Sequence, residues 1–217
     1  MRNLTIFALL LLAIAGFGCA DPAKDKPQAE VAEPAPAPAE PTPTDAMKYV
    51  MVDPSSVGFV GSKVTGSHEG GFNEFTGEFM VNGMDPAQSS VNIEIDATSM
   101  WSDNDDLTTH LKSPDFFDVA SFPTASFSST QIEGGTGGYR VTGNLTLHGV
   151  TKSITFPAAI SVNEERIRAQ AEFAIKRFDF DIVYPGRKDD LIRDDVVIKL
   201  NIAAVPADAA TEPAEAA

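Results

Sequence analysis

Between residues 47 and 206 the apolar side chains tend to recur at every second position. Such alternation is typical of a β-strand that buries one face and exposes the other. Short stretches rich in glycine, proline, asparagine or aspartate separate the alternating segments and predict tight turns between antiparallel strands. The clearest alternating segments are residues 91–96, 139–148, 167–176 and 196–202.

One stretch departs from this alternation. Around residues 103–112, acidic residues precede a short helical spacing of apolar positions, which predicts one short helix or turn. Many strands with one apolar face must either pack as two sheets or close into a barrel. Long strands joined by tight turns favour closure, because a barrel leaves no exposed strand edge. The sequence therefore predicts an all-β, antiparallel chain, and a barrel is favoured over a sandwich.

The first residues have the pattern of a bacterial export signal. A basic residue is followed by an apolar run over residues 4–15, which is too short to cross a bilayer. We therefore assign residues 1–18 to a signal peptide. Cys19 is the only cysteine in the chain, and the residues before it resemble a lipobox, in which the cysteine is acylated and becomes the new N-terminus. Ordinary cleavage after Ala20 is the alternative.

Two flanking segments differ in composition from the domain that they enclose. Residues 19–46 contain many proline, alanine and glutamate residues and hardly any large apolar side chain, which predicts a disordered tether after the lipidated cysteine. Such a tether would hold the domain some distance off the membrane. Residues 207–217 form a similar acidic tail, also expected to be disordered. The remainder, residues 47–206, has the length of one domain with a substantial core.

The charge and the residue motifs exclude several classes of function. The formal net charge of −15 argues against nucleic-acid binding and against electrostatic adhesion to anionic lipids, so acyl chains on Cys19 are the expected membrane contact. The histidines His68, His110 and His148 lie far apart without ligand spacing, and we expect no metal and no cofactor. Nucleophile-elbow and P-loop motifs are missing from the sequence, and we expect no enzyme activity.

Several segments of the domain resemble the signature segments of the YceI-like family, and they occur in that family's order. Each is weak alone, but together they are specific. The segments are residues 49–53, 72–79, 110–119, 122–127, 143–152 and 178–180.

This resemblance implies an extended, lipocalin-like antiparallel barrel of about eight strands with one short helix. Its apolar cavity would hold a polyisoprenoid or another long apolar lipid, usually in a secreted or periplasmic protein. With the lipobox-like segment at Cys19, we expect a membrane-anchored lipoprotein that faces the periplasm or the cell exterior, with the outer membrane favoured. Residues 61–68 and 184–191 depart from the family's common form, which leaves the identity of the ligand open. The side chains expected to contact the lipid are Val91, Ile93, Ile95, Val141, Leu145, Leu147, Phe156, Phe173, Ile198 and Leu200.

Three hypotheses remain open at this point. The favoured one is a lipid-anchored binding protein whose ligand occupies the barrel. In the second, the same ten side chains fill a solid core, and the protein is an adhesion or structural module of the cell envelope. In the third, a polar group at the barrel mouth performs catalysis.

Overall fold

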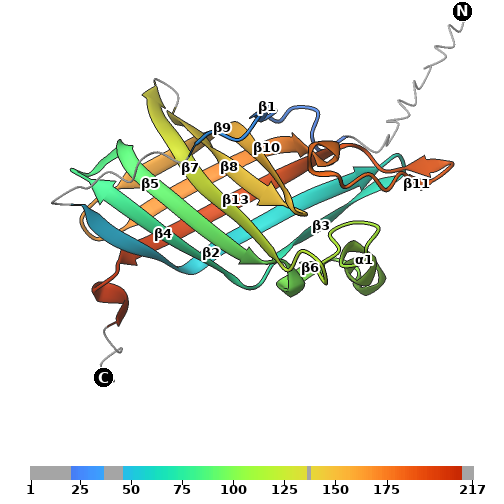
Figure 1. Cartoon of the computed structure of the whole chain (residues 1–217), viewed down its shortest axis with the longest axis horizontal. Coiled ribbons are helices and arrows are strands. Elements are labelled where there is room, and N and C mark those ends of the chain that lie inside the picture. The colour runs from blue at the N-terminus through green and yellow to red at the C-terminus, as the bar shows by residue number, and fades with distance from the viewer. Residues whose placement is uncertain (1–20, 37–45, 136–137, 212–217) are drawn as a thin grey trace, which may run out of the picture.

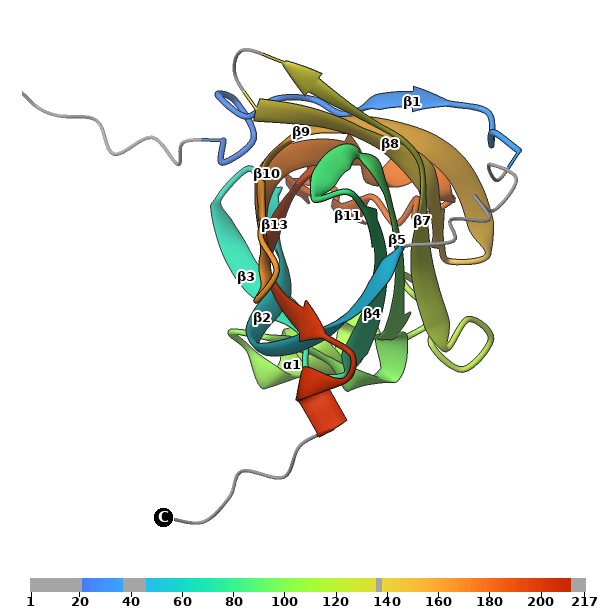
Figure 2. The same ribbon diagram turned by 90° about the vertical axis from the view of Figure 1, so that its left-hand side faces the viewer.

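The computed structural model describes residues 21–36, 46–135 and 138–211, and strands predominate within these parts (Figure 1). Eight antiparallel strands close into a barrel, and Figure 2 shows the ring that they form when seen from one end. The wall strands are β2 (Met47–Lys63), β4 (Phe75–Asn82), β5 (Asp85–Asp96), β7 (Thr124–Gly135), β8 (Gly138–Leu147), β9 (Val150–Val162), β10 (Ile167–Lys176) and β13 (Asp195–Pro206).

The ring closes because the last wall strand pairs with the first. β13 runs antiparallel to β2, with Ile198 opposite Phe59. β2 is long enough to change partners on its other side: residues 47–50 pair with β4, whereas residues 57–63 pair with β3 (Gly66–Phe72). The predicted all-β, antiparallel barrel is therefore confirmed.

The helix predicted near residues 103–112 is also present. It is α1 (Asp105–Leu111), and it follows β6 (Met100–Ser102), a short strand that pairs with β3. Asn104 forms the N-cap, because its side chain accepts a hydrogen bond from the Leu107 amide. The helix covers one end of the barrel, which we call the α1 end (Figure 1).

A small hairpin stands at the same end of the barrel (Figure 1). Its strands, β11 (Gly186–Arg187) and β12 (Asp190–Leu191), pair with each other, and Ile192 forms an isolated bridge with Lys63 at the end of β2. Apart from β1 (Glu30–Ala32), the remaining regular elements in the described parts of the chain are short 3-10 turns. They span Ala97–Ser99, Arg177–Phe180 and Ala209–Thr211.

Residues 21–36 differ from the predicted disordered tether. They pack against the barrel, where β1 (Glu30–Ala32) pairs with β9 (Figure 1). Ala23 is buried against Val60, Ala174 and Val197. The composition of this segment predicted disorder because large apolar side chains are nearly absent, yet small side chains are sufficient where the barrel supplies unpaired backbone and a shallow apolar surface.

The other flanking residues are described only in part. At the C-terminus the amide of Ala207 donates a hydrogen bond to the carbonyl of Lys48, and the 3-10 turn at residues 209–211 follows. The predicted signal peptide, Cys19 and the most proline-rich part of the predicted tether, residues 37–45, lie outside the described residues. Among the described residues, helices long and apolar enough to cross a membrane do not occur.

Candidate functional site

The barrel encloses an elongated cavity of about 390 Å³. Side chains from nearly every wall strand line it, and almost all of them are apolar. Small-molecule sites commonly have volumes of about 300–1,000 Å³ and are lined in this way, with few polar groups. The cavity is therefore large enough and apolar enough to hold a slender hydrophobic molecule.

All ten side chains that the alternation placed inside the barrel line this cavity. They differ in how closely they are packed. Ile95, Val141, Phe156 and Phe173 are buried, and Phe156 stacks on Phe173 with ring centroids 4.2 Å apart. The others remain only half-buried although they point inward, because they border open space. These are Val91, Ile93, Leu145, Leu147, Ile198 and Leu200.

The half-buried inward side chains bear directly on the solid-core hypothesis. In a filled barrel, inward residues on opposite walls touch and become fully buried, because protein interiors are close-packed. Here Val91 and Ile93 on β5 and Leu200 on β13 retain exposed surface toward the axis. The interior of this barrel is therefore hollow.

Sequence reasoning missed other cavity residues. The alternation of β9 continues through Ile154, Ala158 and Ile160, all of which line the cavity. These three inward positions could therefore have been predicted from the sequence. Phe59 and Phe72 also line the cavity, but they lie near glycines that interrupt the apolar alternation of β2 and β3. The alternation therefore did not predict that these two side chains point inward.

Aromatic side chains close the α1 end of the cavity. Phe117 lies 6.5 Å from Phe59 and 6.4 Å from Phe72, measured between ring centroids. Beside them Phe116 contacts His110 and Tyr184 at centroid distances of 5.0 and 5.1 Å. Phe116 is buried, and the cluster packs against Met100, Leu111 and Ile182. These rings form an apolar cap over the cavity.

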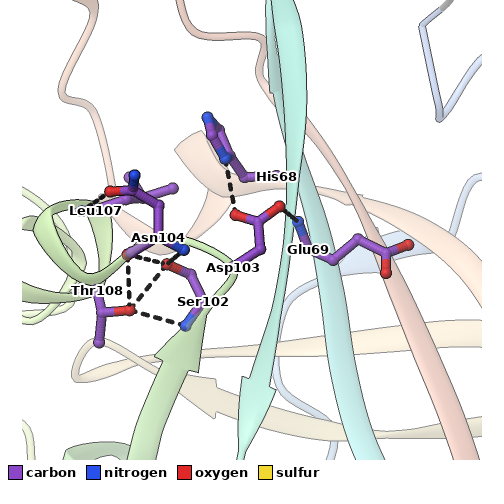
Figure 3. A network of polar contacts seen from close by, with 7 residues as sticks. All are labelled: His68, Glu69, Ser102, Asp103, Asn104, Leu107 and Thr108. Atoms are coloured by element: carbon purple, nitrogen blue, oxygen red, sulfur yellow. Dashed lines mark hydrogen bonds and ion pairs between the residues drawn. The ribbon is translucent and has the colours of Figure 1, made fainter.

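A network of polar contacts fastens α1 to β3 beside this cap (Figure 3). His68 Nδ1 lies 2.8 Å from Asp103 Oδ1, and Asp103 Oδ2 accepts a hydrogen bond from the Glu69 amide at 3.2 Å. Desolvation raises the pKa of Asp103, but the hydrogen bonds from His68 and Glu69 outweigh it, so the net pKa is lowered. At the start of α1 the Thr108 hydroxyl accepts a hydrogen bond from the Ser102 amide at 2.9 Å.

A buried arginine organises the loop that follows β10. Arg177 is 5% exposed and lines the cavity. Its guanidinium donates hydrogen bonds to the carbonyls of Ile182, Ile192 and Arg193 at 2.6, 3.3 and 3.0 Å. Burial lowers the pKa of Arg177, and the nearby charge of Asp194 opposes that shift. The Arg177 side chain thus stabilises its own loop by hydrogen bonding to three of the loop's carbonyl groups.

The opposite end of the cavity is formed by the turns that join β4 to β5 and β9 to β10. Ser89 and Ser90 line it and supply its polar atoms. Tyr49 is fully buried nearby, and its hydroxyl donates a hydrogen bond to the Asn163 carbonyl at 2.9 Å. Burial raises the pKa of this phenol. The tyrosine ties the first wall strand to the β9–β10 turn.

The three histidines do not meet in the structure. His68 pairs with Asp103, His110 Nε2 lies 2.9 Å from Asp115, and His148 Nδ1 lies 3.2 Å from the Phe180 carbonyl. Within the described parts of the chain, His, Cys, Asp and Glu side chains do not gather in groups of three that could hold a metal ion.

Comparison with known proteins shows the family. A model of the YceI-like domain matches residues 50–204. The chain belongs to the YceI-like family. A UPF0312 protein of Yersinia enterocolitica is 39% identical over 92 residues, which are 42% of this chain and 48% of the Yersinia protein. The chain thus spans about half the length of the curated relatives that it matches.

Two solved structures have the same fold. BcnA of Burkholderia cenocepacia superposes with a TM-score of 0.60 at 28% identity, covering 70% of this chain and 96% of BcnA. A polyisoprenoid binding domain from Saccharophagus degradans gives a TM-score of 0.59 at 18% identity, covering 74% of this chain and 99% of that domain. At 18% identity, the likeness to the Saccharophagus domain shows the fold alone.

Proposed function

We propose that this protein binds a polyisoprenoid or a similar long apolar molecule inside the barrel. The observation that carries the proposal is the open, apolar cavity of about 390 Å³, bordered by inward side chains that remain half-buried. The description of the Saccharophagus domain as polyisoprenoid binding supports the same ligand class. The contact residues would be the ten side chains that the alternation placed inside the barrel.

Burial of apolar surface provides enough free energy for such a ligand. Each buried methylene contributes about 0.8 kcal/mol, so about ten buried groups contribute roughly 8 kcal/mol before the loss of ligand freedom is subtracted. Polar atoms at the cavity ends, on Ser89, Ser90 and His68, are available to a polar head group. The affinity would thus depend mainly on chain length, whereas the ends would select the head group.

The decisive experiment is extraction of the purified protein into organic solvent, followed by mass spectrometry. A stoichiometric long-chain isoprenoid or lipid is the expected result. If protein purified from its own host carries none and does not take up added isoprenoids, the proposal fails and an envelope structural module becomes the better hypothesis.

We propose further that the protein is exported and anchored to a membrane through acylated Cys19. The apolar run that precedes this lone cysteine supports the proposal. Replacement of Cys19 by alanine should move the protein from the membrane fraction to the soluble periplasm or the medium. The same fractionation for both proteins would rule out the anchor.

A further inference from the structure

The barrel wall is incomplete between β9 and β10. These two strands pair only from Ile167 opposite Val162 to Gln170 opposite Ala159. Where the pairing stops, β9 continues with Pro157, which has no amide hydrogen to donate to either neighbour. From this point toward the α1 end, the two strands leave a seam in the wall.

Residues 27–32, which we call the strap, occupy this seam. The Ala29 amide donates to the Ala174 carbonyl of β10, and the Ala174 amide donates to the Pro27 carbonyl, both at 2.8 Å. On its other edge the strap pairs antiparallel with β9, with Glu30 opposite Thr155. The strap is thus parallel to β10 and antiparallel to β9, as expected of a strand inserted between them (Figure 1).

The inner face of the strap closes the seam over the hydrophobic interior. Ala29 is 5% exposed and belongs to the same buried cluster as Phe156 and Phe173, while Val31 packs against that cluster. Phe156 and Phe173 also line the cavity. The strap therefore covers the outside of a part of the cavity wall that Phe156 and Phe173 help to form.

The side-chain contacts that hold the strap are few. Its inward side chains are small, and its outer ion pair, between Glu30 and Arg140 at 3.2 Å, involves exposed side chains. Exposed pairs of this kind contribute little to stability. The strap also lies outside residues 50–204, which match the YceI-like domain. A segment with few apolar contacts opens locally without unfolding of the barrel.

We propose that the strap is a removable strand that gates a lateral passage between β9 and β10, through which a long apolar molecule reaches the cavity. This inference rests on the proposed function, because it assigns the route to the same cavity. When the strap leaves, the seam exposes Phe156 and Phe173, and rotation of their rings opens the interior. When it returns, its backbone satisfies the strand edges again.

The sequence position of the strap, shortly after Cys19, relates this passage to the proposed membrane anchor. Asp21 pairs with Arg193 at 3.1 Å, so the segment that leads to the strap is held against the barrel. Two residues span at most about 7 Å, so an acylated Cys19 would be within about that distance of Asp21. If Cys19 is acylated, the bilayer would lie near the end of the barrel that carries Arg193, toward which the seam extends.

A reversible lock tests the gate. In a Cys19→Ala background, Glu30→Cys together with Thr155→Cys places two thiols on directly opposite residues, at a separation that a disulfide can bridge. We expect the oxidised form to release parinaric acid, a fluorescent long-chain polyene, at least about tenfold more slowly than the reduced form, since opening is blocked. Equal release rates in the two forms would show that the ligand passes through a barrel end.

A matched pair of substitutions tests the same gate by loosening it. Ala29→Glu places a charge on the inner face of the strap and should speed release at least about tenfold. Ala32→Glu introduces the same side chain on the exposed face and should leave the rate unchanged. If Ala29→Glu releases the probe at the wild-type rate, the strap does not control passage.

Hydrogen exchange of the wild-type protein separates the gate from the proposed function, because it needs no ligand. The amides of Ala29 and Ala174 should exchange at least about tenfold faster than the amides of the β10–β13 ladder. If they exchange only with the whole barrel, the strap is a permanent wall strand and the inference is wrong. If they exchange early but parinaric acid binds to no variant, the proposed ligand class fails while the opening stands.

Discussion

Leu200→Trp should fill part of the cavity and weaken ligand binding. Leu200 points into the barrel from β13 and is only half-buried, so the larger side chain can extend into open space rather than into the wall. Its neighbour Asn201 is exposed on the outer face, and Asn201→Trp is the matched control. The pair tests both the cavity and the assignment of inward positions.

The magnitude follows from the apolar contact that the ligand loses. Tryptophan has about six more non-hydrogen atoms than leucine, and if half of them occupy ligand space, about three buried methylene-sized groups are displaced, or roughly 2.4 kcal/mol. This corresponds to about a fiftyfold increase in Kd. The free energy of unfolding should change by less than the roughly 1–3 kcal/mol typical of overpacking, because the cavity of about 390 Å³ receives the ring.

The assay compares the lipid-to-protein ratio after purification from one host, together with displacement of parinaric acid from each variant. Wild type and Asn201→Trp should retain the same load, and Leu200→Trp should lose most of it. If all three proteins carry the same load, the cavity is not the binding site. If Leu200→Trp is instead strongly destabilised, Leu200 packs against the opposite wall and the interior is filled.

Three further predictions concern the fold. Gly143→Ala should destabilise the barrel by about 1–3 kcal/mol in urea unfolding, because a Cβ there would collide with the Phe127 ring and the Ser128 carbonyl oxygen; an unchanged midpoint would contradict this close packing. Arg177→Ala should cost about 2–4 kcal/mol by leaving three carbonyls without their donor, and a smaller loss would mean that water replaces it. A hydrogen bond from Lys63 lowers the pKa of Asp190, and one from His68 helps to lower the pKa of Asp103. The contribution of these two carboxylates to the free energy of unfolding is therefore complete above the unfolded pKa of about 3.9 and is lost as the pH falls through their folded pKa values. Asp103→Asn should therefore flatten the acid limb of a stability–pH profile, and an unaltered limb would contradict this assignment.

The alternation of apolar residues by itself determines much of the fold. A period of two in a strand places alternate side chains on opposite faces, which is a local property of extended backbone. It therefore placed ten of the side chains that line the cavity, Phe156 on β9 among them, from segments as short as residues 91–96. The helix near residues 103–112 was likewise visible in the sequence, because acidic residues and a helical spacing occur within one turn of each other.

The tertiary structure alone decided whether the barrel is hollow. Ile93 and Leu200 would show the same alternation whether they faced a ligand or the opposite wall. The alternation indicates which way a side chain points, but it does not indicate how far away the opposite wall lies. The order of the strap likewise could not be predicted from the sequence. Its composition predicts disorder, since Ala29 and its neighbours bury little surface on their own. Its order depends on unpaired backbone at Ala174 and Thr155, more than a hundred residues away, and only the closed barrel brings that seam to the strap.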